Sequence, residues 1–393
     1  MAMEKKYLIA NPGSASRKYA LYEGDKQLLF CHLEEEDGGF VATYDTLGKK
    51  NKVSVSESDY KKGGAFFISL LLEEKLISQK NEIAAIGFRI VAPGDYFSTI
   101  RKIDSGYIEK LRKVSEKAPL HTTGVFVEIN EFSELLPEAV FVGISDSAFH
   151  SDMPNVAREY AITSDMHEAG IKRYGYHGIS FSYISSKMKD IFGSIPERAI
   201  VCHLGGGSSI TALKNGKSID TSMGFTPLEG LVMATRSGNI DVSAAVEIAR
   251  NKKISIEEVE EYLNKECGLL GVSGFSSDIR ELLKKESKGD ERSSLALQMF
   301  VYRIKKYIGS YIAALGGLDA LIFTATVGER SYIMRSRICE KMDSLGIIID
   351  EKKNGGLPGE GFIEDASSRV KIAVIPTDET LEMAREMRGY LKI

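Results

Sequence analysis

The chain has only four cysteines, and none of them stands in a pairing or metal-binding motif. Cys31, Cys202, Cys267 and Cys339 are far apart and form no CxxC pair. This scarcity argues against a disulfide framework and against a zinc site. It is typical of proteins from a reducing compartment.

Long apolar runs and a large excess of one charge are also missing. No stretch approaches the roughly 18 apolar residues of a membrane-spanning helix. The run Tyr7–Ala10 is too short for the apolar core of a signal peptide. The net charge of −4 gives no basic footprint for nucleic acid or an anionic membrane. We therefore expect a cytoplasmic protein that binds neither membranes nor nucleic acids.

What the sequence does have is enough length and apolar content for more than one core. Its 393 residues exceed the size of an ordinary domain, so two domains are expected. Apolar residues make up 43% of the chain and charged residues 27%, which indicates a soluble globular protein.

A turn rich in glycine and serine occurs twice. "YLIANPGSASRKYALYEGDK" and "AIVCHLGGGSSITALKNGKS" each read as strand, small-residue turn, strand and glycine-containing turn. Aligned at a spacing of 192 residues (205 − 13), they share five identities: Gly13 with Gly205, Ser16 with Ser208, Ala20 with Ala212, Leu21 with Leu213 and Gly24 with Gly216. The match suggests a duplicated domain; chance is the alternative, since turns favour glycine and serine in any protein.

The first of these turns carries more polar groups than a hairpin needs. Asn11, Gly13, Ser14 and Ser16 offer N–H and hydroxyl donors that can hold an anion. An ordinary hairpin is the alternative.

The rest of each half alternates helices and strands. In the first half we predict strands near 7–11, 16–22, 27–32, 83–91 and 139–145, and helices near 64–77 and 106–117. In the second half we predict strands near 198–203, 208–213, 318–325 and 369–376, and helices near 241–251 and 292–315. This order predicts an α/β fold with two mixed sheets covered by helices. A cleft between the halves would hold a phosphate chain between the two turns.

Three basic side chains stand in contexts that suit anion binding. Arg89 and Arg236 lie in small-residue contexts beside apolar strands, where a guanidinium can bind a carboxylate or phosphate through paired hydrogen bonds. Surface salt bridges are the alternative. His177 is flanked by Gly175 and Gly178, so another group can approach its ring closely. A structural histidine is the alternative.

Two acidic side chains complete the set. Asp146 follows the strand "AVFVGIS", at the strand end where α/β proteins place functional groups. Glu379 opens the last helix, where it either complements the helix N-terminus or holds Mg²⁺. We expect these two carboxylates to come from different domains and to meet in the cleft.

With these residues in place, the chain resembles the acetate kinases, in the superfamily of acetate and sugar kinases, heat-shock chaperones and actin. The resemblance covers nearly the whole length. It rests on the blocks "NPGSASRK", "GFRIV", "APLH", "SDSAFHSDMP", "RYGYHGIS", "CHLGGGSS", "DTSMGFTPLEGLVMATRSGNID", "ECGLLGVSG", "FTATVGER" and "PTDETLEMAR".

The resemblance implies a fold and an assembly. It implies two duplicated actin-like (ribonuclease H-like) domains with the active-site cleft between them. The N-terminal domain would span 1–148, with a C-terminal helix over 380–393 packed back on it. The C-terminal domain would span 149–379 and carry the nucleotide site and the interface of a homodimer. The apolar stretches within 292–325 would supply part of that interface.

The resemblance also implies a reaction. This is the reversible transfer of the ATP γ-phosphoryl group to acetate by direct in-line displacement, giving acetyl phosphate and ADP, with Mg²⁺ or Mn²⁺ as the cofactor. The two arginines would hold the carboxylate and the phosphoryl group, and His177 would bind phosphoryl oxygens. Asp146 would act on the metal and its water. The matching catalytic residues are Asp146, His177, Arg236 and Arg89, and the matching metal ligands are Asn11 and Glu379.

Two binding sites follow from the same resemblance. The acyl group would be bound by Arg89, Val91, Leu120, Tyr176 and Pro227. The nucleotide and its phosphates would be bound by Lys18, His203, Leu204, Gly205, Gly206, Gly207, Asp278, Ile279, Arg280, Thr326, Val327, Gly328, Glu329 and Arg330, with Ser208 at the end of the phosphate-contacting turn.

The chain departs from the family pattern around these pockets. The departures are Phe88, Ala92, Pro93, Thr122, Thr123, Gly206, Thr326 and Arg330. Thr326 adds a β-branched side chain where backbone alone would face the purine. ATP and acetate are therefore the expected substrates, with a pyrophosphate-dependent acetate kinase or a propionate kinase as the alternative. A non-catalytic nucleotide switch, like actin or a chaperone, is the alternative from another class.

Overall fold

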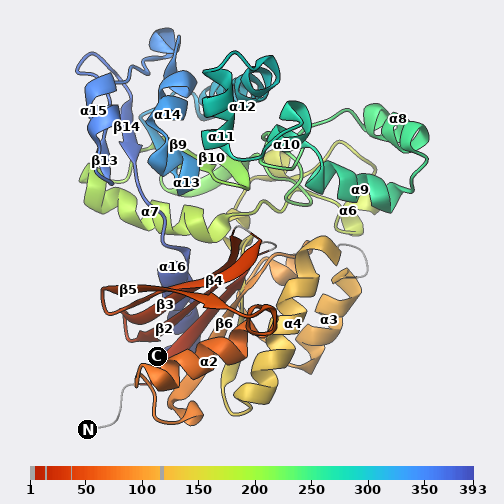
Figure 1. The fold of residues 1–393 in the computed structure, drawn as a ribbon. Helices are drawn as coiled ribbons and strands as arrows, with labels where there is room; N and C mark the ends of the chain where they lie inside the picture. The colour runs from red at the N-terminus through yellow and green to blue at the C-terminus, as the bar shows by residue number, and fades with distance from the viewer. Residues whose placement is uncertain (1–4, 14–15, 37, 116–118) are drawn as a thin grey trace. The chain divides into compact units, whose positions relative to one another are not determined.

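The computed structural model describes residues 5–13, 16–36, 38–115 and 119–393, with the backbone alone for 119–121. The chain divides into two compact units. Unit 1 comprises Met1–Ala148 and Asp378–Ile393, and unit 2 comprises Phe149–Thr377. The end of the chain, dark blue in Figure 1, thus belongs to the same unit as its beginning.

Within the described part of unit 1, eight strands form one sheet in the order β5-β4-β3-β2-β1-β6-β8-β7. These strands are β1 (Lys6–Pro12), β2 (Ser16–Glu23), β3 (Lys26–Glu36), β4 (Gly39–Thr46), β5 (Lys49–Val55), β6 (Ile83–Ile90), β7 (Arg101–Lys102) and β8 (Val140–Ser145). β1, β6 and β8 run parallel, whereas the other pairings are antiparallel. The sheet is therefore mixed, as predicted.

Helices cover both faces of this sheet (Figure 1). They are α1 (Glu57–Lys61), α2 (Gly63–Glu73), α3 (Ser105–Ser115), α4 (Pro119–Leu135) and α16 (Glu379–Leu391). Leu8 on β1 faces a core that contains residues of α2 and α4, such as Phe67 and Phe132. On the other face Gly87 of β6 leaves room for α16, because a Cβ there would lie 3.2 Å from Met387 Sδ. This packing brings the first residue of α16 to the sheet.

Unit 2 repeats the plan. Its six described strands follow the order β11-β10-β9-β12-β14-β13. They are β9 (Arg198–Leu204), β10 (Ser208–Lys214), β11 (Lys217–Thr221), β12 (Ala320–Thr324), β13 (Gly361–Phe362) and β14 (Lys371–Val374). β9, β12 and β14 run parallel, and β10 and β11 are added antiparallel. The order β11-β10-β9-β12-β14 thus has the directions of β3-β2-β1-β6-β8, which confirms the duplicated fold.

The long helix α12 and helix α7 lie on the sheet of unit 2. The helices are α5 (Asn155–Arg158), α6 (Ser164–Glu168), α7 (Gly178–Phe192), α8 (Val242–Lys252), α9 (Ile256–Lys265), α10 (Gly268–Ser273), α11 (Ile279–Glu286), α12 (Glu291–Leu315), α13 (Ala325–Arg330), α14 (Tyr332–Cys339) and α15 (Glu351–Gly356). Cys202 and Leu204 of β9 share a core with Phe300 and Ile304 of α12. α7 packs against β9 with its own buried side chains, among them Phe181.

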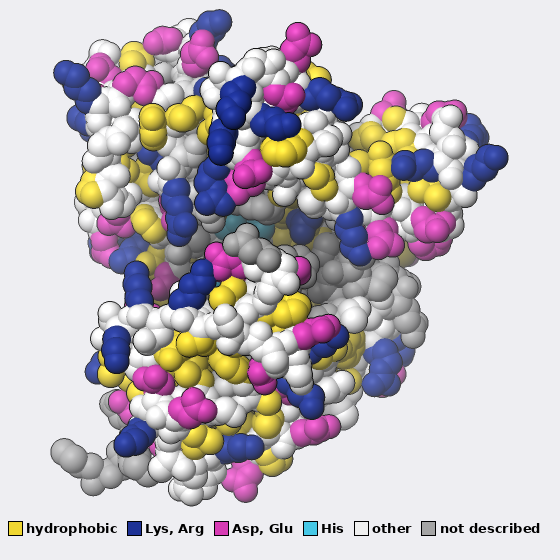
Figure 2. Space-filling model, viewed as in Figure 1, with side chains coloured by type: hydrophobic (Ala, Val, Ile, Leu, Met, Phe, Trp, Pro, Cys, Tyr) yellow, Lys and Arg dark blue, Asp and Glu magenta, His cyan; other side chains and the backbone are white. Residues whose placement is uncertain are grey.

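The surface shows no single dominant charge on the face drawn in Figure 2, where basic and acidic side chains are interspersed over both units. Among the described residues, no helix is long and apolar enough to cross a membrane. All four cysteines are free.

Candidate active site

Four polar side chains of unit 1 meet in one cluster, which we call the arginine cluster. Arg89 donates from Nε and Nη2 to the two carboxylate oxygens of Asp146, at 3.1 and 3.0 Å. Its Nη1 donates to Glu379 Oε2 at 3.3 Å, and Asn11 Nδ2 donates to the same oxygen at 3.2 Å. Asn11 and Asp146 are 4% and 1% exposed. The side chains of Arg89 and Glu379 are 17% and 15% exposed, so the cluster joins a cation, two carboxylates and an amide at a largely buried site that solvent still reaches.

The sheet explains why these residues meet. β1, β6 and β8 run parallel, so their carboxyl ends lie at one edge. Asn11 lies near the end of β1 and Arg89 near the end of β6. Asp146 directly follows β8, where its N–H donates to Ile90 O at 2.9 Å. Glu379 is the first residue of α16, capped by Asp378, whose side chain accepts from Leu381 N at 2.9 Å.

Electrostatics keep Arg89 charged. Burial by itself would lower the pKa of its guanidinium, but the carboxylates of Asp146 and Glu379 outweigh that effect and hold the pKa above its ordinary value. A guanidinium held in place by a bidentate ion pair is suited to binding a carboxylate or phosphoryl oxygen.

One expectation about this cluster was wrong. We expected Asp146 and Glu379 to come from different domains, with Glu379 at the end of the second. Both lie in unit 1. The physical reason is that α16 packs on the sheet of unit 1 from its first residue, so the chain returns to unit 1 before Glu379.

A second cluster lies in unit 2 around the turn between β9 and β10. The rings of His177 and His203 are stacked, with centroids 4.1 Å apart and planes 23° apart. A Cβ on Gly207 would lie 3.3 Å from His177 Nε2 and 3.5 Å from Arg236 Nη1. Glycine at this position therefore leaves space that an imidazole and a guanidinium both face. We call His177, His203, Arg236 and Gly207 the histidine cluster.

The backbone holds His177 in an uncommon conformation. Its φ of 57° lies in the left-handed region, immediately before α7 begins at Gly178. A side chain there costs conformational energy, and such residues gather at functional sites. Arg236 Nη1 also donates to Pro227 O at 3.4 Å, which ties the cluster to the "TPLEG" segment.

A pocket of about 670 Å³ opens beside the same turn. Most of its lining comes from the turn, the start of α11, and α13 with the start of α14. The lining residues are Gly205, Gly206, Ala234, Leu269, Ser277, Asp278, Ile279, Arg280, Leu283, Thr326, Val327, Arg330, Ser331, Tyr332 and Ile333. Its volume is in the range of small-molecule sites. Asp278 pairs with Arg280, whose hydrogen bond lowers the pKa of that carboxyl.

The structure brings together many of the residues predicted for the nucleotide, but not all of them. Those that line the pocket are Gly205, Gly206, Asp278, Ile279, Arg280, Thr326, Val327 and Arg330. His203 and Gly207 belong to the histidine cluster. Gly328 is buried, Glu329 accepts from Thr377 N at 3.2 Å, and Leu204 is in the core. Lys18 lies in unit 1, opposite Asn11 in the β1–β2 pairing.

The residues predicted for the acyl group divide between the units. Tyr176 is buried and donates from its hydroxyl to Phe225 O at 2.7 Å, two residues before Pro227 in unit 2. Val91 follows β6 in unit 1 and is half-buried. Leu120 lies in α4, but its side chain is outside the described residues, as is the whole of Ser14.

Several residues of these sites were not predicted from the sequence. Ser209 contacts His177, and Ala234, Leu269 and Tyr332 line the pocket. Ser209 stood in the quoted "GGGSS" turn, so its hydroxyl was a visible signal. The others are ordinary apolar or small residues that only the fold brings to the pocket.

Comparison with known proteins identifies the family. Residues 6–385 match the family described as the Acetokinase family. An acetate kinase of Clostridium novyi (strain NT) is 41% identical over 98% of this chain and 98% of that protein. The chain belongs to the acetokinase family. It is therefore a kinase, an enzyme that transfers phosphoryl groups.

Solved structures of family members have the same fold. The crystal structure of Porphyromonas gingivalis acetate kinase is 37% identical with a TM-score of 0.85, covering 98% of this chain and 100% of that one. A propionate kinase from Francisella tularensis subsp. tularensis SCHU S4 is also 37% identical, with a TM-score of 0.88, covering 97% and 98%. The sheets and helices of both units are thus those of the acetokinase family.

Proposed function

We propose that this member of the acetokinase family transfers a phosphoryl group between ATP and acetate, giving acetyl phosphate and ADP. The observation that carries the proposal is the arginine cluster, in which Arg89 is aligned by both oxygens of Asp146 beside Glu379 and Asn11. A carboxylate substrate and a phosphoryl group both need such an oriented guanidinium. The acetate kinases at about 40% identity support acetate as the acceptor.

The proposed step is a direct displacement. An acetate oxygen forms a bond to the γ-phosphorus. The bond between the γ-phosphorus and the β–γ bridging oxygen breaks, and ADP leaves with its electron pair. Little covalent help is needed, and catalysis comes from positioning and charge neutralisation. Arg89 would bind the acetate carboxylate, while Arg236 and His177 would bind the transferring phosphoryl oxygens. Asp146 would orient Arg89 and, as the resemblance implies, the metal-bound water.

The donor set of the arginine cluster fits magnesium. Mg²⁺ takes oxygen ligands, few of them carboxylates, and keeps waters and substrate phosphates. Asn11, Glu379 and Asp146 offer an amide oxygen and two carboxylates in one cluster. In the described part of the chain no three His, Cys, Asp or Glu side chains are grouped to hold a metal by themselves. As the resemblance implies, Asn11 and Glu379 would hold the ion, which would offset the phosphate charge.

The pocket beside the β9–β10 turn would take the nucleotide. Asp278, Ile279 and Arg280 stand at the start of α11 and would contact the adenosine, opposite Thr326 and Val327 of α13. The glycine turn would contact the phosphates, with Lys18 added from unit 1. The acyl methyl group would be enclosed by Tyr176, Pro227, Val91 and Leu120. Propionate is a second candidate acceptor because one structure of this fold is named a propionate kinase.

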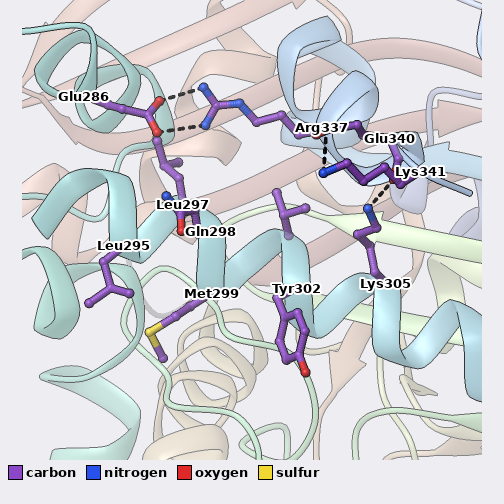
Figure 3. A pocket seen from close by; sticks show the side chains of 11 residues that line it. Glu286, Leu295, Leu297, Gln298, Met299, Tyr302, Lys305, Arg337, Glu340 and Lys341 are labelled. Atoms are coloured by element: carbon purple, nitrogen blue, oxygen red, sulfur yellow. Dashed lines mark hydrogen bonds and ion pairs between the residues drawn. The ribbon is translucent and has the colours of Figure 1, made fainter. Parts of the chain in front are cut away.

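The assembly belongs to the same proposal. We propose a cytoplasmic homodimer whose two domains correspond to the two units. Leu295, Met299 and Tyr302 point from α12 to the same side in Figure 3, and they are 52%, 37% and 66% exposed. Their i, i+4, i+7 spacing makes one apolar stripe, and all three line a pocket of about 740 Å³. An apolar stripe of this kind suits contact with a second copy of the chain.

The decisive experiment measures acetyl phosphate formed from acetate, ATP and Mg²⁺, trapped with hydroxylamine. We expect product, and a kcat lower by roughly a hundredfold or more in Arg236→Ala, because one preorganised donor to developing charge is lost. Arg250→Ala, an exposed arginine of α8, is the matched control and should keep full activity.

Two results would contradict parts of the proposal. No product above a magnesium-free control at high acetate would end the kinase assignment for acetate. In the reverse direction, consumption of inorganic phosphate but not of ADP would replace ATP by pyrophosphate.

A further inference from the structure

His177 is held on one side by a side chain that no part of the proposed reaction uses. Its Nδ1 lies 2.9 Å from Ser209 Oγ. Its Nε2 is the ring nitrogen that faces Gly207, close to Arg236 Nη1. Ser209 is on β10, directly opposite His203 in the β9–β10 pairing, and is fully buried.

We propose that Ser209 is a positioning residue that keeps His177 neutral, with its proton on Nε2. The proposal rests on the role given above to His177, which would donate from Nε2 to a phosphoryl oxygen. It adds the residue that selects this donor form. A histidine that held its proton on Nδ1 would present a lone pair to the phosphoryl oxygen and repel it.

The neighbouring histidine shows how hydroxyls fix protons here. Ser180 Oγ donates to Thr377 Oγ1 at 2.9 Å, so its lone pairs are left to accept from His203 Nδ1 at 2.8 Å. His203 therefore carries its proton on Nδ1. Ser180 thus favours a proton on Nδ1 of His203, whereas Ser209 would favour a proton on Nε2 of His177.

Ser209 has no comparable acceptor. Among the described residues, the only hydrogen bond of its hydroxyl is the one to His177. A buried O–H that does not donate loses the hydrogen bond it had in water. The hydroxyl is therefore best satisfied when it donates to Nδ1 of a neutral His177, which places the ring proton on Nε2.

The surrounding charges favour the same form. A protonated His177 would stand beside the guanidinium of Arg236 and against the stacked ring of His203. Like charges disfavour one another at this range. The neutral form avoids that repulsion, so Arg236 supplies the positive charge and His177 supplies a directed N–H.

The test reads the tautomer directly. Histidine-¹⁵N-labelled protein is examined by long-range ¹H–¹⁵N correlation NMR at pH 7, with the His177 signals assigned by their loss in His177→Asn. We expect Nε2–H in the unaltered protein. In Ser209→Ala we expect a mixture of tautomers or a shift to Nδ1–H. Its kcat should fall roughly tenfold, as for other residues that orient a reacting side chain, with the KM for acetate unchanged.

Two further variants separate positioning from packing. Ser209→Thr keeps the hydroxyl and should restore the Nε2–H form and most of kcat. Thr211→Val removes another buried hydroxyl of β10, which bonds Thr221 Oγ1 at 2.8 Å, and should change neither the tautomer nor kcat.

An Nδ1–H or doubly protonated His177 in the unaltered protein would overturn the proposal, as would an unchanged tautomer in Ser209→Ala. The NMR result needs no turnover. If His177→Asn kept full kcat, the proposed role of His177 would fail, while the assignment of the tautomer to Ser209 would still be decided by the spectra.

Discussion

At the residue scale, partners decide the state of each buried charge. Arg89 stays charged because two carboxylates surround it. Glu128 of α4 differs from Arg89, because burial outweighs the effect of its partners on its pKa. It is 1% exposed, accepts from Tyr19 Oη at 2.7 and 2.8 Å, and pairs with Arg17 Nε at 3.1 Å. Burial raises its pKa to about 7, although the hydrogen bond from Tyr19 and the charge of Arg17 oppose the shift.

This shift predicts a loss of stability with rising pH. The folded carboxyl holds its proton up to pH 7, whereas the unfolded one, with an ordinary pKa of 4.5, releases it earlier. The unfolded state binds fewer protons between these values, so the free energy of unfolding falls as the pH rises through that window. From pH 5.5 to 8 the loss is about 2 kcal/mol. Glu128→Gln should remove it.

The measurement is urea denaturation followed by circular dichroism at pH 5.5 and pH 8. Between pH 5.5 and pH 8 the free energy of unfolding should fall in the unaltered protein. In Glu128→Gln this fall should be smaller by the contribution of Glu128. Glu109→Gln serves as the control, because the exposed Glu109 has its pKa lowered by its hydrogen bond to Lys113 and stays ionised throughout. Parallel pH profiles for Glu128→Gln and the unaltered protein would show that Glu128 is already ionised at pH 5.5.

At the scale of elements, one buried cation fixes α13. Arg335 of α14 is 2% exposed and donates from Nη1 to the carbonyl oxygens of Gly328 and Glu329, at 2.9 and 2.8 Å. Its Nε and Nη2 donate to Asn354 Oδ1 and O, at 2.7 and 3.0 Å. A buried charge needs such compensation. The result is that α13, which lines the pocket proposed for the nucleotide, is held in place through the carbonyl oxygens of its last turn.

Because α13 is anchored, we expect Thr326 to stay in place when a purine binds in the pocket. Its β-branched side chain is stiff, and it is exposed in the pocket. Thr326→Gly should lower the KM for ADP roughly three- to tenfold, since removing this side chain widens the part of the pocket proposed to bind the purine, which we call the purine slot. Steady-state kinetics in the direction of ATP formation measure this change.

Thr326→Val keeps the branched shape and should leave the KM for ADP near its original value. Equal KM values for the unaltered protein and Thr326→Gly would place Thr326 outside the purine slot. A lower KM in Thr326→Val instead would point to the hydroxyl rather than to bulk.

At the scale of the whole molecule, one topology is used twice with different additions. Both units have two antiparallel strands beside three parallel ones, but unit 1 adds the β4–β5 hairpin and unit 2 adds α8 to α11. The apolar stripe of α12 belongs to unit 2, and we expect it to join two copies of the chain.

Tyr302→Glu should convert the proposed dimer to a monomer, because a carboxylate buried in an apolar interface loses its hydration. Light scattering at micromolar concentration gives the mass. Leu47→Glu is the control: Leu47 is similarly exposed, at 57%, in the β4–β5 turn of unit 1. A monomeric mass for the unaltered protein would contradict the proposed assembly, and a Tyr302→Glu dimer would move the interface elsewhere.

Local sequence determined most of the strands and several long helices. Residues 7–11, 16–22, 198–203 and 208–213 alternate or run apolar and are bounded by turn residues, so β1, β2, β9 and β10 were predictable within two residues at each end. The duplicated turn, with Gly205 and Ser208 repeating Gly13 and Ser16, predicted the repeated mixed sheet. The family blocks predicted which charged residues to examine.

Only the tertiary structure decided which of those residues meet. α4 and α7 are rich in β-branched, aromatic and serine residues, whose preference for helix is weak, and packing on the sheets settles them as helices. Glu379 reaches Arg89, and with it Asp146, because α16 docks on unit 1, although Arg89 and Glu379 are 290 positions apart in the sequence. Ser209 contacts His177 because the β9–β10 register sets Ser209 opposite His203, and the ring of His177, just before α7, stacks on that of His203. Such contacts depend on long-range packing, which no local pattern encodes.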